Sequence, residues 1–180
     1  MDLPPGSLTP SPTEDGYFFY FAYGSCMCPV DLKRSLGEST HAYVVGPAIL
    51  SGYRLGFFRR SRLRNCGVLD ITPNASSSVH GVLYRLPWRL SKALDHREEG
   101  YQQETVTVVC GNRLYHGTRT YTVIRKLVTE VAPNDWYSNV VLRGAATCGL
   151  PEEYWWHLFH HIHRLQCQEK FADPAIPRAA

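Results

Sequence analysis

The sequence F-F-Y-F-A-Y-G-S-C-M-C-P occupies residues 18–29 and places a strand, a turn and a helix start in direct succession. The aromatic run before Gly24 carries almost no polarity, which is typical of a strand buried on both faces. A glycine after such a strand lets the backbone turn so that its N–H groups approach a ligand closely. Pro29 suits the first position of a helix, which Gly37 would end. The stretch therefore predicts a cradle for an anionic group, with an ordinary core strand and tight turn as the alternative.

The composition is that of one globular domain. A length of 180 residues is sufficient for a substantial core, and the net charge of +3 is too small to predict nucleic-acid binding. The first residues lack the basic and apolar segments of a signal peptide, and no stretch has the length of a membrane span. The six cysteines are then expected to be reduced thiols. We expect a cytoplasmic protein that binds neither nucleic acid nor membrane.

Periodicity and turn residues divide the chain into strands and helices. Strands are expected at 18–23, 48–58, 67–71, 79–86, 105–110 and 114–124, with a Ser-rich loop between the third and fourth of them. Helices are expected to begin at Pro29, Trp88, Asp135 and Pro151, the third of them capped by Asn134. Residues 17–172 are expected to form the domain, preceded by a disordered tail at 1–16 and followed by a tail at 173–180.

Four segments, in this order along the chain, resemble the gamma-glutamylcyclotransferase family. They are F-A-Y-G-S at 21–25, G-V-L-Y at 81–84, L-D-H-R-E at 94–98, and the stretch from Tyr137 to G-L-P-E-E-Y at 149–154. The resemblance covers nearly the whole chain between the two tails. It implies an α+β fold, in which a small mixed β-barrel is flanked by helices.

The resemblance also implies a reaction. In this family the α-amine of a gamma-glutamyl peptide or amine attacks its own γ-carbonyl, which releases 5-oxoproline and the free amine. Because the substrate supplies the nucleophile, the enzyme needs neither a nucleophile of its own nor a cofactor. It must supply a base, donors for the α-carboxylate and the developing oxyanion, and walls that exclude water. The expected partner is a small gamma-glutamyl substrate, and the enzyme would be a monomer or a homodimer.

The catalytic general acid/base is implied to be Glu98, the last residue of L-D-H-R-E. The family usually has glycine next, but here Glu99 stands at that position, so Glu99 is the alternative acid. Leu90 and Leu94 mark the buried side of the same helix, and Glu98 continues their stripe four residues later. We therefore expect Glu98 to be the buried acid and Glu99 its solvated neighbour. Without the resemblance, both would be read as a solvated helix end.

The glutamyl group is implied to bind at the turn after the first strand and against two tyrosines. The residues implied to bind substrate are Tyr23, Gly24, Ser25, Cys26, Tyr101 and Tyr137. Cys26 stands where most family members have asparagine, and it is also a candidate reactive thiol. Either Tyr101 or Tyr137 could instead be a core tyrosine with a satisfied hydroxyl group.

Two polar clusters have other interpretations. His157, His160 and His161 are expected on the solvent side of the last helix, and no metal site is predicted there. The basic stretch 59–64 is expected to be an ordinary solvated loop. Its alternative role is to attract a carboxylate on the leaving group, since arginine binds carboxylates bidentately.

Two rival functions remain open. The first keeps the fold and reaction but uses glutathione, a gamma-glutamyl amine or a protein-attached gamma-glutamyl group as substrate. The second is a non-catalytic protein that binds a small carboxylate or a partner in the same pocket.

Overall fold

Five strands form a closed barrel in the order β1-β3-β2-β4-β5. The computed structural model describes residues 16–172, so the predicted tails, apart from Gly16, lie outside the described residues. The strands are β1 (Tyr17–Ala22), β2 (Val44–Ser61), β3 (Cys66–Pro87), β4 (Tyr101–Cys110) and β5 (Arg113–Val123). Four of the pairings are antiparallel, and β1 closes the barrel by pairing in parallel with β5. The predicted mixed barrel flanked by helices is confirmed.

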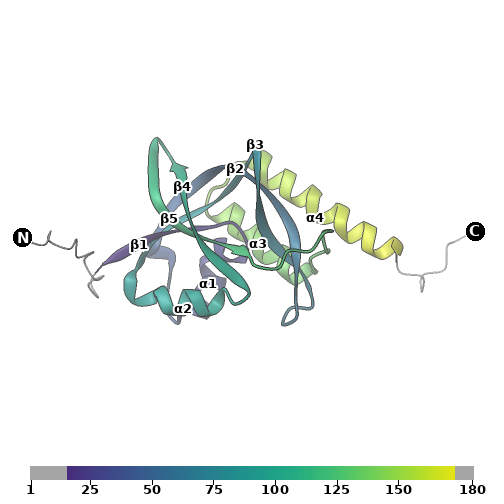
Figure 1. Cartoon of the computed structure of the whole chain (residues 1–180), viewed down its shortest axis with the longest axis horizontal. Coiled ribbons are helices and arrows are strands. Elements are labelled where there is room, and N and C mark those ends of the chain that lie inside the picture. The colour runs from purple at the N-terminus through teal and green to yellow at the C-terminus, as the bar shows by residue number, and fades with distance from the viewer. Residues whose placement is uncertain (1–15, 173–180) are drawn as a thin grey trace, which may run out of the picture.

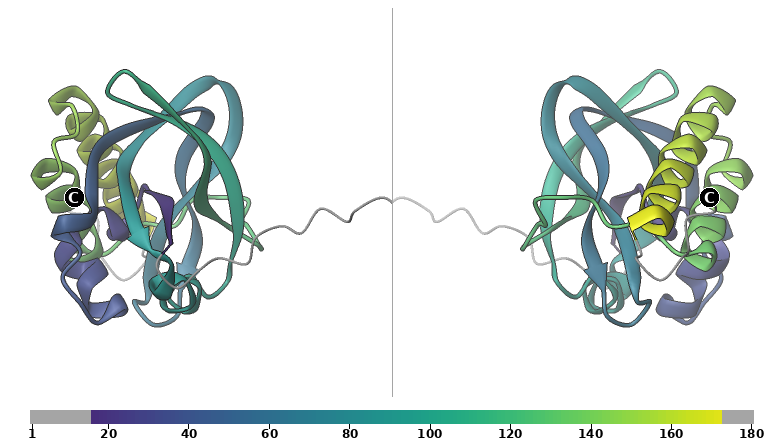
Figure 2. Two further views of the ribbon diagram at one scale, coloured as in Figure 1. Left: turned by 90° about the vertical axis from the view of Figure 1, so that its left-hand side faces the viewer. Right: turned by 90° about the vertical axis from the view of Figure 1, so that its right-hand side faces the viewer.

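The helices lie outside the barrel. They are α1 (Pro29–Leu36), α2 (Ser91–Arg97), α3 (Asp135–Thr147) and α4 (Glu152–Ala172), with short 3-10 turns at Ser25–Met27, His41–Tyr43 and Trp88–Leu90. Figures 1 and 2 show α3 and α4 along one side of the barrel, and the shorter α1 and α2 near one end of it. Within residues 16–172, no helix is both long and apolar enough to cross a membrane.

Local signals set the helix ends where the sequence predicted them. The side chain of Asn134 accepts a hydrogen bond of 2.8 Å from the backbone N–H of Tyr137, which satisfies a donor of the first turn of α3. Gly37 ends α1 in the left-handed conformation, with φ of 79°, which a side chain would disfavour. Both predictions are confirmed.

The predicted Ser-rich loop is wrong, because residues 66–87 form one continuous strand. Strand β2 pairs with both halves of β3, from Ser61 opposite Cys66 to Val44 opposite Tyr84. The register shifts between Ser51 and Tyr53, where an irregularity lets the two long strands bend around the barrel. A long bent strand exposes much of its middle to solvent, so its polar sequence resembles that of a loop.

The turn after β1 is held from two sides. The hydroxyl group of Tyr84, which is fully buried, donates a 3.0 Å hydrogen bond to the carbonyl oxygen of Met27. Gly144 in α3 lies against the same backbone, and a Cβ atom there would come within 2.6 Å of the nitrogen of Cys28. Because α3 can approach this closely only at a glycine, the turn is pressed between the barrel and α3.

Candidate active site

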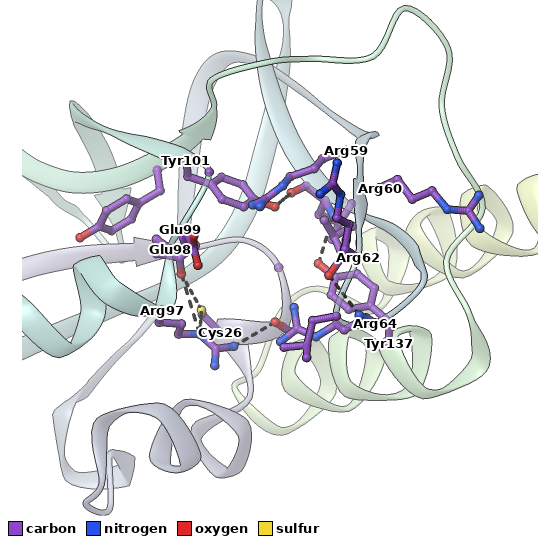
Figure 3. A pocket seen from close by; sticks show the side chains of 18 of the residues that line it. Cys26, Arg59, Arg60, Arg62, Arg64, Arg97, Glu98, Glu99, Tyr101 and Tyr137 are labelled. Atoms are coloured by element: carbon purple, nitrogen blue, oxygen red, sulfur yellow. Dashed lines mark hydrogen bonds and ion pairs between the residues drawn. The ribbon is translucent and has the colours of Figure 1, made fainter.

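A cavity of about 720 Å³ lies where the turn after β1, the end of α2 and the β2–β3 turn meet (Figure 3). This volume falls within the range of small-molecule sites. All the residues to which the sequence analysis gave a role line this cavity: Tyr23, Gly24, Ser25, Cys26, Glu98, Tyr101 and Tyr137. Folding therefore brings segments from distant parts of the sequence to one cavity.

The carboxylate of Glu98 faces the turn after β1. Glu98 directly follows α2, and its backbone N–H donates to the carbonyl oxygen of Leu94 at 3.1 Å. Its side chain is only 12% exposed, whereas Glu99 is exposed, so the expected difference in burial is present. Oε1 of Glu98 accepts hydrogen bonds from the thiol of Cys26 at 3.1 Å and from the hydroxyl group of Tyr20 at 3.4 Å. Glu99 also lines the cavity, but on its solvent side.

Arg97 is a site residue that the sequence did not reveal. Its guanidinium donates hydrogen bonds to Sγ of Cys26 at 2.9 Å, to Oγ of Ser25 at 3.1 Å and to Oδ2 of Asp31 at 2.6 Å. The side chains of Arg97 and Asp31 are 10% and 6% exposed. The buried side chain of Arg97 thus connects the end of α2 to the turn after β1 and to α1 by hydrogen bonds. In the sequence, Arg97 and Asp31 look like ordinary charged residues on two short helices.

Burial at this site keeps Cys26 in its thiol form. Burial raises the pKa of Cys26 to about 12, and Glu98 adds to this effect although Arg97 opposes it. A thiol with this pKa is protonated at neutral pH and is a poor nucleophile. Cys26 therefore acts as a hydrogen-bond donor to Glu98 and as an acceptor from Arg97.

Tyr101 and Tyr137 both line the cavity and have satisfied hydroxyl groups. Tyr101 donates to the carbonyl oxygen of Leu69 at 3.0 Å, and the oxygen of Tyr137 accepts from the N–H of Leu69 at 3.1 Å. Burial raises the pKa of each tyrosine, so both stay neutral. A Cβ atom at Gly24 would lie 3.2 Å from the Tyr137 oxygen, so the turn packs closely against this ring.

The basic stretch predicted to be a solvated loop also lines the cavity. Arg59 and Arg60 lie at the end of β2, and Arg62 and Arg64 lie in the turn that leads to β3. Figure 3 shows Arg62 and Arg64 on the side of the cavity opposite Glu98 and Cys26. Arg60 and Arg62 are exposed, as expected for a solvated loop, but the stretch is not an ordinary one, because the long β2–β3 hairpin places its turn beside the site.

The histidines on α4 are not all on its solvent side. His157 and His160 are exposed, but the side chain of His161 is 13% exposed, with Nε2 2.7 Å from Oε1 of Glu130. The segment after β5 carries Glu130 to this position, which the pattern of α4 alone could not indicate. Among residues 16–172, no three His, Cys, Asp or Glu side chains are grouped so that they could hold a metal ion.

Comparison with known proteins identifies related sequences. The model of the AIG2-like family matches residues 78–158. YkqA of Bacillus subtilis, whose name marks it as a suspected gamma-glutamylcyclotransferase, is 31% identical over 140 residues, which are 74% of this chain and 48% of YkqA. The chain thus spans about half the length of this relative. The crystal structure of YkqA superimposes with a TM-score of 0.75 at 31% identity, covering 83% of this chain and 55% of that one.

More distant structures share the fold. One named gamma-glutamyl cyclotransferase has a TM-score of 0.72 at 22% identity and covers 79% of this chain and 86% of its own. A yeast gamma-glutamyl cyclotransferase specific to glutathione has a TM-score of 0.60 at 15% identity and covers 83% of this chain and 97% of its own. At identities of 22% and 15%, the similarity to these two structures shows a shared arrangement of strands and helices and nothing further.

Proposed function

We propose that this chain, which shares the fold and the sequence pattern of the gamma-glutamylcyclotransferase family, converts a gamma-glutamyl peptide or amine to 5-oxoproline and the free amine. The nitrogen of the substrate's α-amine forms a bond to the γ-carbonyl carbon, and the bond from that carbon to the leaving nitrogen then breaks. Both reacting groups belong to one molecule, so the site has to hold the substrate curled and to move protons.

The observation that carries the proposal is the position of the Glu98 carboxylate. It is largely buried, it lines the cavity, and its Oε1 lies 3.1 Å from Cys26 in the predicted binding turn. In the proposed reaction, Glu98 takes a proton from the substrate's ammonium group before attack. It later transfers this proton to the leaving nitrogen, which departs as a neutral amine, while the ring nitrogen releases its second proton to solvent.

The remaining residues bind and orient the substrate. Backbone N–H groups of the turn Tyr23–Cys26 are proposed to hold the α-carboxylate and the oxyanion that develops on the γ-carbonyl. Arg97 is a positioning residue, because its donors are engaged by Ser25, Cys26 and Asp31. Tyr101 and Tyr137 are proposed to form walls that keep water from the curled substrate.

The experiment that tests the reaction is release of 5-oxoproline from a panel of gamma-glutamyl dipeptides, gamma-glutamyl amines and glutathione. Purified, metal-free protein is expected to turn over at least one member, and a chelator is expected to leave the rate unchanged. Tight calorimetric binding of one member, without turnover of any, would instead favour a non-catalytic protein that binds small carboxylates. Loss of activity with chelator and its recovery with zinc would contradict the metal-free mechanism.

A second prediction concerns Cys26. Because its thiol is protonated and the substrate carries its own nucleophile, the Cys26→Ser variant is expected to retain most of the activity. A serine hydroxyl group can still donate to Glu98 and accept from Arg97. Alkylation of Cys26 with a bulky reagent is expected to inhibit turnover, because the added group would fill the proposed binding site at the turn after β1. Mass spectrometry of enzyme quenched during turnover checks the assignment, since a glutamyl thioester on Cys26 would show covalent catalysis.

A further inference from the structure

Five arginines form a basic rim around the candidate active site. The arginine rim consists of Arg59, Arg60, Arg62, Arg64 and Arg125, all of which line the cavity. Four come from the β2–β3 hairpin, and the fifth follows β5. Within residues 16–172, no carboxylate oxygen lies within 4.0 Å of a rim guanidinium nitrogen, whereas Arg97 in the same cavity is paired with Asp31. The rim therefore holds several like charges, none of which forms an ion pair within the described part of the chain.

Two rim arginines are held in place by aromatic rings. The guanidinium carbon of Arg59 lies 4.7 Å from the ring centre of Tyr101, and a Cβ atom at Gly100 would come within 2.3 Å of its Nη2. The guanidinium carbon of Arg64 lies 5.5 Å from the ring centre of Tyr137. Cation–π contacts of this kind orient a guanidinium while leaving N–H donors at its edge. These heads are thus positioned to bind an anion.

A gamma-glutamyl group does not need so much positive charge. It carries one α-carboxylate and one α-ammonium group, and the proposed function places the ammonium beside Glu98. Figure 3 shows Arg62 and Arg64 across the cavity from Glu98, and we expect the released part of a substrate to lie on that side. Clustered positive charges repel one another, and an anion that binds among them reduces this repulsion. Such a cluster therefore favours the binding of an anion.

We propose that the preferred substrates are gamma-glutamyl compounds whose released amine carries more than one anionic group, such as an acidic amino acid, and that the arginine rim selects them. This inference rests on the proposed function for the position of the glutamyl half. The guanidinium groups of the rim can donate two hydrogen bonds at once to a carboxylate or to a phosphate.

Two dipeptides that differ mainly in charge test this selectivity. Gamma-glutamyl-glutamate and gamma-glutamyl-glutamine have nearly the same size, but only the first has a second carboxylate on the released residue. We expect kcat/KM to be about 10-fold higher for gamma-glutamyl-glutamate, since hydrogen bonds to a charged group discriminate by this order. The preference is expected to shrink as salt is added, because the rim is partly exposed.

Binding measured without turnover separates this inference from the reaction. Calorimetry with the Glu98→Gln variant is expected to show the same preference for gamma-glutamyl-glutamate. If no peptide is turned over but the preference persists in binding, the reaction is wrong and the anionic selectivity stands. If gamma-glutamyl-glutamine is processed and bound as well as gamma-glutamyl-glutamate, the inference is overturned and the reaction stands. Gamma-glutamyl-O-phosphoserine shows whether phosphate is preferred to carboxylate, and either order keeps the anionic selectivity.

Variants locate the selectivity in the rim. Arg64→Gln is expected to reduce the preference several-fold, and Arg62→Gln, whose side chain lies in the same turn, provides a second test should Arg64 prove necessary for folding. Arg143→Gln on the exposed face of α3 removes the same charge at a residue that does not line the cavity and is the matched control. An equal loss of preference in Arg143→Gln, or an unchanged preference in both rim variants, would contradict the assignment.

Discussion

Replacement of Glu98 by glutamine is expected to lower turnover about 10²- to 10⁴-fold while leaving the protein folded. Glutamine has nearly the same size, and its amide oxygen can still accept a hydrogen bond from Cys26. It cannot take up and return a proton, which is the step that the proposed reaction requires. The measurement is the rate of 5-oxoproline release at saturating substrate, together with a thermal unfolding curve for each variant.

Glu99→Gln is the matched control for this prediction. Glu99 is the adjacent carboxylate and lines the same cavity, but it is exposed to solvent. Its replacement by glutamine is therefore expected to change turnover only a few-fold. If Glu99→Gln were inactive and Glu98→Gln active, the acid would be misassigned although the reaction could still hold. Equal, large losses in both variants would show that the two carboxylates act together.

Replacement of Arg97 by glutamine is expected to have the largest effect on stability. The change leaves Asp31 buried without its cation, and loss of one partner of a buried ion pair destabilises a protein by about 3–5 kcal/mol. For a domain of this size, that corresponds to a fall in Tm of roughly 6–20 °C. Activity should fall as well, because Arg97 holds Ser25 and Cys26 in the turn.

A surface pair provides the comparison for Arg97. Arg89 and Glu38 form a bidentate ion pair, but their side chains are 52% and 31% exposed. Solvent screens such a pair, so Arg89→Gln is expected to shift Tm far less than Arg97→Gln. Calorimetric or fluorescence melting of both variants in one buffer measures the difference. Similar shifts would mean that the Arg97–Asp31 pair adds no more than a surface contact.

The sequence predicted the helices well because their signals are local. Asn134 caps α3 and Gly37 ends α1 through contacts within one turn, which neighbouring residues encode directly. The strand boundaries of β2 and β3 were predicted less well. Their middle segments are polar and partly exposed, and only their pairing with each other across the bend makes them strands. No local pattern records that pairing.

The sequence alone indicated a resemblance to a family and the main residues that line the cavity. The motif around Gly24, the acid Glu98 and Tyr137 could be found because each lies in a recognisable segment. It also indicated that Glu98 would be more buried than Glu99, since helical spacing continues the stripe of Leu94.

Tertiary structure alone decided how charge is arranged around that cavity. Arg97 and Asp31 lie on different helices, and their side chains meet only because α1 and α2 pack at the same end of the barrel. The β2–β3 hairpin likewise carries Arg64 to the wall opposite Glu98. Contacts between residues so far apart in sequence depend on the path of the whole chain, and charged residues have no periodicity that would reveal a distant partner.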